Sequence, residues 1–358
     1  KYLYSPPTNH RDRRARKPAR KMLLLKLVQL IAVVAACSAF VAPGSNVLGK
    51  HRSSSAISMM ADRMPMSDGS NVAIITPMKP NGDIDEGAFR EILRWHVECE
   101  TDGIVALGTT GEASTLNMDE RAQVLKIVVE EVKGKIPIIA GTGTIKTSGC
   151  IEMAQQAKDM GADATLVVTP YYVKPPQRAL ITHFTAIANA VDLPIMLYNV
   201  PGRTGCDMKP ETVAELAKVK NIVAVKEATG DNSRVATLRE LCGPDFKLYS
   251  GEDAAGKDFV LSGGNGVVSV TSNVAPAEMH QMMMAALKGD AAKATEIDDA
   301  LQMLHKRLFL EANPIPVKWA LHRMGRADVG VRPPLCPLDP ALDAPLCEAL
   351  QAAGIPTV

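Results

Sequence analysis

From Asn71 onward, short apolar runs alternate with longer stretches in which apolar residues recur every three or four positions. Each run has four or five residues and lacks the apolar–polar alternation of a strand with one face in water. Such runs are typical of parallel strands that are buried on both faces. The sequence therefore predicts eight strands, at Val72–Thr76, Gly103–Leu107, Ile136–Ala140, Ala164–Val168, Pro194–Tyr198, Ile222–Lys226, Phe246–Tyr249 and Gly266–Val270.

The stretches between the runs have the periodicity of amphipathic helices. In Asp85–Glu98, four apolar residues fall on one face, and in Asn117–Val132 the residues Asn117 and Glu120 have the spacing of a capping box. Eight such strand–helix units predict an α/β fold, a (β/α)8 TIM barrel. A doubly wound open sheet is the alternative. The count of eight and the lack of a G-x-G-x-x-G motif after the first strand disfavour it.

Beyond about residue 290 the strand pattern stops and helical patterns continue. They cover residues 291–308, 316–324 and 339–353, with proline-rich joints between them. This pattern predicts a C-terminal helical appendix. We therefore expect three parts: a basic N-terminal region over residues 1–70, a catalytic barrel over 71–289, and a C-terminal helical domain over 290–358.

Lys226 ends the sixth apolar run, directly before a turn and a helical pattern. In barrel enzymes, the carboxyl ends of the strands carry the chemistry. Burying an ammonium group is unfavourable, so a lysine at this position has its pKa lowered by desolvation and can form a Schiff base with a carbonyl substrate. The alternative is a structural lysine that extends its charged end to the rim of the sheet.

Other polar residues follow neighbouring strands. The loop Gly108–Glu112 has two glycines around two hydroxyls, so its N–H groups can bind a carboxylate, although a plain tight turn explains it equally well. Tyr172 belongs to a tandem pair that packing alone can explain. Tyr198 ends the fifth strand, where its hydroxyl can relay protons, and Arg203 follows where it can clamp a carboxylate.

No cluster of histidine, cysteine and acidic residues suggests a metal site. Glu252 and Asp253, after the seventh strand, are interpreted as caps of the next helix. The seven cysteines are single and irregularly spaced, which indicates reduced thiols and no disulfide framework.

Formal net charge is +1, but it is unevenly distributed. Residues 1–70 carry 12 Lys and Arg against 3 acidic residues, whereas residues 71–358 carry 28 against 36. The predicted folded part is therefore mildly acidic, which argues against a nucleic-acid partner. Anionic substrates must be held by local groups.

The first seventy residues have the character of a targeting segment. Met22 opens an apolar run to Ala36, which is too short to span a membrane but has the length of a signal-peptide core. Small residues, Phe40 and a serine-rich, acid-poor stretch follow. This arrangement resembles the bipartite plastid presequence of algae with secondary plastids, with Met22 as the start and no membrane anchor in the mature protein. An ordinary secreted protein and an uncleaved tail are the alternatives.

Taken together, the strand-end residues resemble the 4-hydroxy-tetrahydrodipicolinate synthase (dihydrodipicolinate synthase) family of pyruvate-dependent class I aldolases. The resemblance extends from Val72 to about Gly354. It is most specific at Gly108–Glu112, Val168–Tyr172, Tyr198–Gly205, Val225–Gly230 and Asn313–Lys318.

The resemblance implies a role for each matching residue. Lys226 would be the Schiff-base lysine, and Thr110 and Tyr198 would form a proton relay. Tyr172 would complete that relay from a second subunit, and Arg203 would bind the carboxylate of L-aspartate semialdehyde. The residues expected to line the pyruvate pocket are Thr109, Gly251 and Val268.

The resemblance also implies the chemistry: condensation of pyruvate with L-aspartate semialdehyde in the diaminopimelate route to lysine, by a homo-oligomer built as a dimer of dimers. The covalent iminium activates pyruvate, so no external cofactor is expected. Sialic acid lyases and keto-sugar-acid aldolases share the lysine, the tyrosine and the barrel, but they resemble this chain less around Arg203. A non-catalytic barrel would require a broken relay, and the relay residues are all present.

One departure from the family concerns inhibition by lysine. Relatives that bind lysine have an asparagine and a glutamate where this sequence has Ile145 and Gly149. A lysine ligand would lose its carboxylate partner there, which typically costs about 1.5–3 kcal/mol. We therefore expect weak or absent lysine inhibition.

Overall fold

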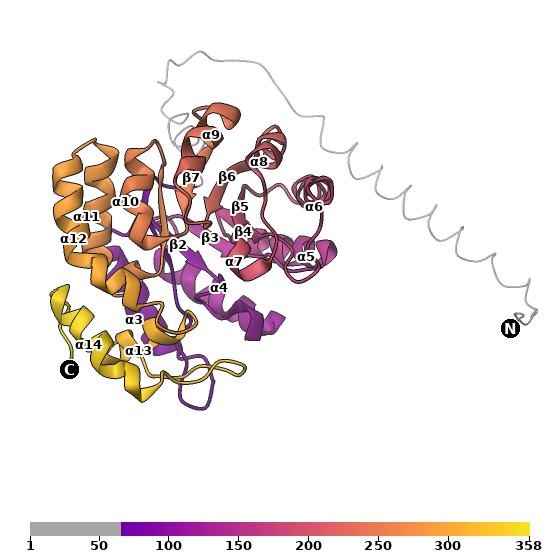
Figure 1. The fold of residues 1–358 in the computed structure, drawn as a ribbon. Helices are drawn as coiled ribbons and strands as arrows, with labels where there is room; N and C mark the ends of the chain where they lie inside the picture. The colour runs from indigo at the N-terminus through magenta and orange to yellow at the C-terminus, as the bar shows by residue number, and fades with distance from the viewer. Residues whose placement is uncertain (1–65) are drawn as a thin grey trace, which may run out of the picture. The chain divides into compact units, whose positions relative to one another are not determined.

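The computed structural model describes residues 66–358. The expected presequence features, including Met22 and Phe40, lie outside the described residues. Within them, eight parallel strands close into a barrel in chain order, so each strand pairs with its sequence neighbours and β1 pairs with β8 (Figure 1). The expected TIM barrel is therefore confirmed. The strands are β1 Gly69–Ala73, β2 Gly103–Ala106, β3 Ile138–Gly141, β4 Ala164–Val168, β5 Ile195–Asn199, β6 Ile222–Glu227, β7 Lys247–Ser250 and β8 Gly266–Ser269.

Helices follow the strands and surround the barrel. They are α3 Glu86–Glu98, α4 Met118–Val132, α5 Thr147–Asp159, α6 Gln177–Ala190, α7 Pro201–Thr204, α8 Pro210–Ala217, α9 Ser233–Cys242, α10 Asp253–Leu261 and α11 Pro276–Leu287. The predicted capping box is present at the start of α4, where the Asn117 side chain accepts from Glu120 N and the Glu120 carboxylate accepts from Asn117 N. This exchange satisfies two main-chain donors, which stabilises the helix start.

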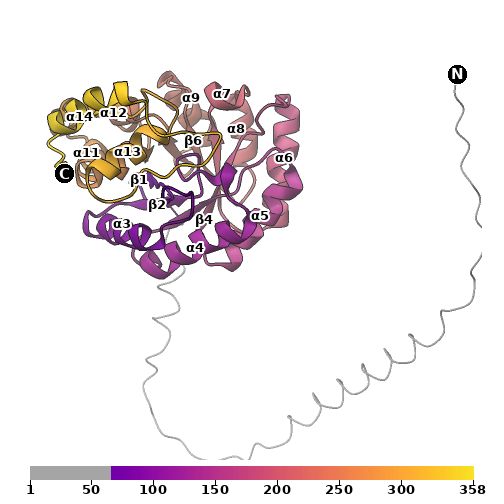
Figure 2. The ribbon, with the colours of Figure 1, turned by 90° about the horizontal axis from the view of Figure 1, so that it is seen from below.

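The C-terminal helices are α12 Ala291–Arg307, α13 Ile315–Arg323 and α14 Asp343–Ala352. Figure 2 shows them gathered with α11 on one side of the barrel. Their apolar residues share one core with α3, α4 and the first three strands, so the appendix is packed onto the barrel. None of the helices within residues 66–358 is long and apolar enough to cross a membrane.

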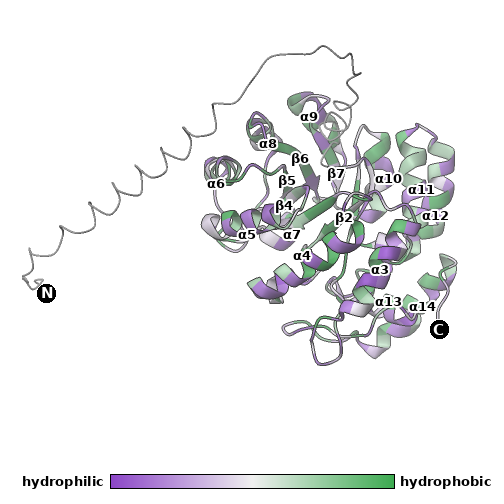
Figure 3. Cartoon of the chain, turned by 180° about the vertical axis from the view of Figure 1, so that it is seen from behind, coloured by the Kyte–Doolittle hydropathy of each residue, from purple (hydrophilic) through white to green (hydrophobic). Residues whose placement is uncertain are grey.

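The strand positions agree with the apolar runs to within two residues, with one exception. β1 begins at Gly69, three residues before the predicted start, because Gly69–Val72 pair with β8. β3 begins at Ile138, since Pro137 has no N–H to donate to a neighbouring strand. Figure 3 shows the strands as largely hydrophobic and helices such as α4 as divided between hydrophobic and hydrophilic faces, as the periodicity predicts.

Candidate active site

The carboxyl ends of β2, β5, β6 and β7 surround a small cavity of about 40 Å³ at the mouth of the barrel. Six of the eight residues singled out in the sequence line it: Thr109, Thr110, Tyr198, Arg203, Lys226 and Gly251. Val268 lies instead within β8, where it is buried in the interior core with Tyr198 and Tyr249, and Val270 lines the cavity. Tyr172 does not line it.

Lys226 is buried, with 6% of its surface exposed. Desolvation by burial lowers the pKa of its ammonium group to about 8 against the opposing pull of the Asp253 and Glu252 carboxylates. Its Nζ lies 4.5 Å from the centre of the Tyr198 ring. An amine with this pKa is unprotonated in an appreciable fraction near neutral pH, which is the form that attacks a carbonyl carbon.

Tyr198 is the neighbour of Lys226 across the β5–β6 pair. Burial raises the pKa of its phenol to about 12, while Arg203 and a hydrogen bond with the Thr109 side chain act in the opposite direction. The phenol therefore holds its proton firmly near neutral pH. It can pass that proton along a hydrogen bond without leaving a stable buried phenolate.

The two threonines of the β2 loop have different partners. The side chain that hydrogen bonds to Tyr198 is that of Thr109, one residue earlier than the expected Thr110. The buried Thr110 hydroxyl instead accepts a hydrogen bond from Asn313 Nδ2 at 2.9 Å. The two residues lie in a turn, in which Glu112 N donates to Thr109 O at 3.1 Å, and their side chains have different partners.

Gly251 is required by the packing around Lys226. A Cβ atom at Gly251 would lie 2.9 Å from Lys226 Cε and 2.5 Å from Ala228 Cβ. Any larger residue would therefore displace the lysine from its present position. The sequence identified Gly251 only by its match to the family, and the structure supplies the physical reason.

The capping interpretation of Glu252 and Asp253 is wrong for their side chains. Glu252 is the N-cap of α10 but makes no side-chain cap bond, and it lines the cavity. The buried Asp253 carboxylate accepts from Val270 N and Thr271 N at 2.9 and 3.0 Å. It thus joins the ends of β7 and β8 and places a negative charge near Lys226.

Arg203 lies on the short helix α7 after β5 and lines two cavities. The second has a volume of about 480 Å³ and shares Gly108, Thr109 and Tyr198 with the first. A guanidinium group between a small inner cavity and a larger outer one can bind a carboxylate on a second substrate.

Tyr172 lies on the loop after β4 and is 86% exposed. Its φ of +70° is uncommon for a residue other than glycine, and Lys174 in the same loop has a φ of +45°. Its neighbours Tyr171 and Val173 are also exposed. The chain therefore holds Tyr172 outward, away from its own cavity.

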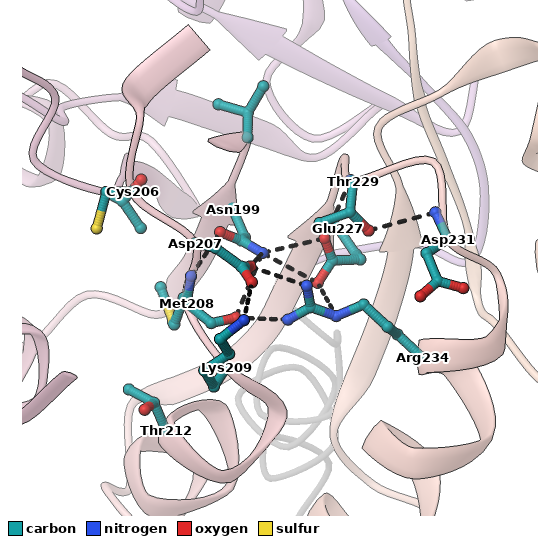
Figure 4. Close-up of polar contacts among 12 residues, drawn as sticks. Asn199, Cys206, Asp207, Met208, Lys209, Thr212, Glu227, Thr229, Asp231 and Arg234 are labelled. Atoms are coloured by element: carbon teal, nitrogen blue, oxygen red, sulfur yellow. Dashed lines mark hydrogen bonds and ion pairs between the residues drawn. The ribbon is translucent and has the colours of Figure 1, made fainter. Parts of the chain in front are cut away.

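A polar network outside the cavity supports the ends of β5 and β6 (Figure 4). Asn199 Nδ2 donates to Glu227 Oε1 at 3.1 Å and to Asp207 Oδ1 at 3.0 Å, and Arg234 Nη1 donates to Asp207 Oδ1 at 2.8 Å. Because side chains alternate along a strand, the residues that follow Tyr198 and Lys226 point away from the cavity. The network thus fixes the two strand ends. The sequence signal was a polar residue directly after each candidate residue.

The C-terminal appendix holds the β2 loop. The buried Lys318 ammonium pairs with the Glu112 carboxylate, whose other oxygen accepts from Arg332 N at 3.1 Å. Glu112 has a φ of +52°, so these contacts hold the loop in an uncommon conformation. No sequence spacing predicts this contact, because the two charges are 206 positions apart.

No group of three or more histidine, cysteine and acidic side chains within residues 66–358 has the arrangement of a metal site. The cavity offers an amine, hydroxyls and a guanidinium group. This set is suited to covalent carbonyl chemistry on carboxylate substrates.

The family model and the curated relatives that this chain matches are dihydrodipicolinate synthases. The family model described as "Dihydrodipicolinate synthetase family" matches residues 66–353. The 4-hydroxy-tetrahydrodipicolinate synthase of Alcanivorax borkumensis is 53% identical over 290 residues, which are 81% of this chain and 99% of that protein.

Two solved structures are similar over most of the chain. One is the chloride-inhibited dihydrodipicolinate synthase of Acinetobacter baumannii with pyruvate, at 48% identity and a TM-score of 0.80, covering 81% of this chain and 99% of that one. The other is the synthase of Cyanidioschyzon merolae with lysine bound, at 40% identity and a TM-score of 0.79, covering 82% and 99%.

Proposed function

Because the chain belongs to the dihydrodipicolinate synthetase family, we propose that it condenses pyruvate with L-aspartate semialdehyde, as a 4-hydroxy-tetrahydrodipicolinate synthase in the diaminopimelate route to lysine. The observation that carries the proposal is Lys226. It is buried at the mouth of the barrel with its pKa lowered to about 8, next to the Tyr198 ring. No external cofactor is needed, because the iminium itself is the electron sink.

The reaction begins when the neutral Lys226 amine attacks the ketone carbon of pyruvate and water leaves, which forms an iminium. Loss of a proton from the pyruvate methyl group gives an enamine. The enamine carbon attacks the aldehyde carbon of the semialdehyde, and the aldehyde oxygen takes up a proton. The amine of the second substrate then adds to the iminium carbon and displaces Lys226, which closes the ring and restores the enzyme.

The protons move through Tyr198 and Thr109, which are joined by a hydrogen bond. Thr110 lies in the same loop but bonds to Asn313, so we assign it to the pyruvate carboxylate instead. Tyr172 completes the relay from a second copy of the chain. Its exposure and outward conformation support this assignment, since it cannot serve the cavity of its own chain in that position. We propose a dimer of dimers as the assembly.

Arg203 binds the carboxylate of the semialdehyde as that substrate enters from the outer cavity. Arg203→Ala should therefore impair use of the semialdehyde far more than adduct formation with pyruvate. A charge-assisted pair of this kind contributes about 1.5–3 kcal/mol, or roughly tenfold to over a hundredfold. If both this variant and the wild type cleaved sialic acid or a keto-sugar acid efficiently, the assignment would pass to those aldolases.

The decisive experiment traps the Schiff base. The protein is treated with borohydride with and without pyruvate, and its peptides are analysed by mass spectrometry. We expect inactivation together with a pyruvate-dependent mass gain on the peptide that contains Lys226. Lys226→Arg is the control and should gain no mass. A modification on another lysine, or no modification, would contradict the proposal.

For the N-terminal region we propose delivery to a plastid. The family model matches from residue 66, and the apolar core and Phe40 of the preceding residues have the pattern of a bipartite presequence. A reporter fused to residues 22–66 should enter the plastid, and Phe40→Ala should divert it. Secretion of the unaltered fusion would favour the alternative of a secreted protein.

A further inference from the structure

Asn313 is a buried residue of the C-terminal segment that reaches the active site. It is 6% exposed, and it lines the same small cavity as Lys226 and Thr110. Its Nδ2 donates to Thr110 Oγ1 at 2.9 Å across 203 positions of sequence. Its Oδ1 is buried and has no hydrogen-bond partner among the described residues.

This hydrogen bond determines how Thr110 can use its only proton. A threonine hydroxyl has one hydrogen to donate and two lone pairs to accept. The amide nitrogen of Asn313 can only donate, so the bond occupies a lone pair of Thr110 and leaves the O–H free. The O–H must then point to another acceptor. A carboxylate of a bound substrate accepts only, so it is the matching partner.

We infer that Asn313 is a positioning residue that makes Thr110 a hydrogen-bond donor to the carboxylate of pyruvate. This inference rests on the proposed function, because the carboxylate belongs to the substrate bound by Lys226. It gives the C-terminal segment a defined part in substrate binding: the appendix sets the direction of one hydroxyl at the barrel mouth.

Contacts of the neighbouring residues Gly111 and Glu112 hold the Thr110 hydroxyl and the Asn313 amide in fixed positions. The Glu112 carboxylate, two residues after Thr110, is held by Lys318 and by Arg332 N, and Gly111 O accepts from Thr76 Oγ1 at 2.8 Å. The segments that contain Thr110 and Asn313 are therefore joined by the contacts of Glu112 with Lys318 and Arg332 N. Neither hydroxyl nor amide has to be ordered when substrate binds, which lowers the entropic cost of binding.

Asn313→Asp is the most direct test, because it replaces a donor by an acceptor. The new carboxylate would accept the hydrogen bond that the Thr110 hydroxyl otherwise donates to the substrate. Its negative charge would also repel the substrate carboxylate. The pyruvate concentration needed for half-maximal adduct formation should rise at least about tenfold. The increase should become smaller as the pH falls, since the introduced carboxyl group can donate again once it is protonated. Asn221→Asp is the control for the charge and for general destabilisation. Asn221 directly precedes β6, at the end of the strand away from Lys226.

A double-mutant cycle shows whether Asn313 acts through Thr110. Thr110→Val should raise the pyruvate requirement at least about tenfold, and Asn313→Leu about two- to tenfold. If the inference is correct, Asn313→Leu changes the requirement by less than about twofold in the Thr110→Val background. Thermal unfolding of each variant separates these effects from loss of fold.

The outcomes are distinct. If wild-type protein forms no adduct with pyruvate, the proposed function fails. If wild type forms it and Asn313→Asp needs no more pyruvate than wild type, the amide does not donate to Thr110 and the inference is overturned. Additive effects of Asn313→Leu and Thr110→Val would overturn it as well, and they decide the matter even if Asn313→Asp does not fold.

Discussion

Two loops at the mouth of the barrel are held in opposite ways. The β2 loop, residues 108–112, is fastened by the C-terminal appendix through a buried ion pair and a hydrogen bond to Thr110. The β4 loop, residues 171–174, is exposed and has two residues other than glycine at positive φ. The first loop is held by its own chain, whereas the second leaves Tyr172 exposed. Under the proposed function, Tyr172 would serve the site of a second copy, so one loop would depend on tertiary and the other on quaternary contacts.

The largest effect is expected from Lys318→Met, which removes the ion pair that holds the β2 loop. It leaves the buried Glu112 carboxylate without its partner, and breaking a buried pair in this way typically costs about 3–5 kcal/mol. We expect a large fall in the free energy of unfolding, measured by urea titration, together with loss of activity. Lys126→Met is the control, because Lys126 pairs with Glu130 at the surface and should contribute at most about 1 kcal/mol. Equal losses in the two variants would refute the asymmetry.

Tyr172→Phe tests the other loop and should have the opposite profile. Because the hydroxyl is exposed in the single chain, stability should not change, whereas kcat should fall about a hundredfold through loss of a proton-transfer group. Tyr171→Phe is the control. Co-expression with Lys226→Ala chains should restore activity, since a mixed dimer has one site with both Lys226 and a Tyr172 from its partner. No recovery would mean that Tyr172 does not act between subunits.

The pH dependence of adduct formation sharpens the comparison further. Burial lowers the pKa of Lys226 to about 8, so the neutral amine increases about tenfold per pH unit below 8 and levels off above it. The trapping rate should follow this curve in the wild type. In Lys318→Met, loosening of the β2 loop should admit water, so the pH at which the trapping rate levels off should rise. In Tyr172→Phe, that pH should not change. A rate that still rises near pH 10 in the wild type would show that Lys226 is not desolvated.

The smallest effect concerns lysine, which we expect to inhibit weakly or not at all. The outer cavity beside Tyr171 is lined by the buried Arg121, whose positive charge disfavours an ammonium group. Ile145, at the position where the family resemblance implies an asparagine for lysine binding, is exposed and apolar. Titration of lysine into the coupled assay should give no inhibition at micromolar concentration. The double variant Ile145→Asn with Gly149→Glu should gain sensitivity. A Cβ at Gly149 lies 3.1 Å from Thr144 Cγ2, so a small shift accommodates it.

The barrel could be predicted from the chain because its signals are local. Eight apolar runs at regular intervals, each followed by an amphipathic stretch, lead to one closed sheet, and β4 matches its predicted bounds at both ends. Lys226 and Tyr198 were found for the same reason, since each is a polar residue at the end of an apolar run. In a parallel barrel, all such ends meet at one mouth.

The remaining features depended on contacts between distant parts of the chain. The sequence placed Thr110 beside Tyr198 and Thr109 in the pyruvate pocket, whereas in the structure Thr109 contacts Tyr198 and Thr110 contacts Asn313. It did not pair Glu112 with Lys318 or direct Asp253 to the main chain after β8. Periodicity reports how a segment is buried, but the direction of a side chain in a loop is decided by partners that only the folded chain brings within hydrogen-bonding distance.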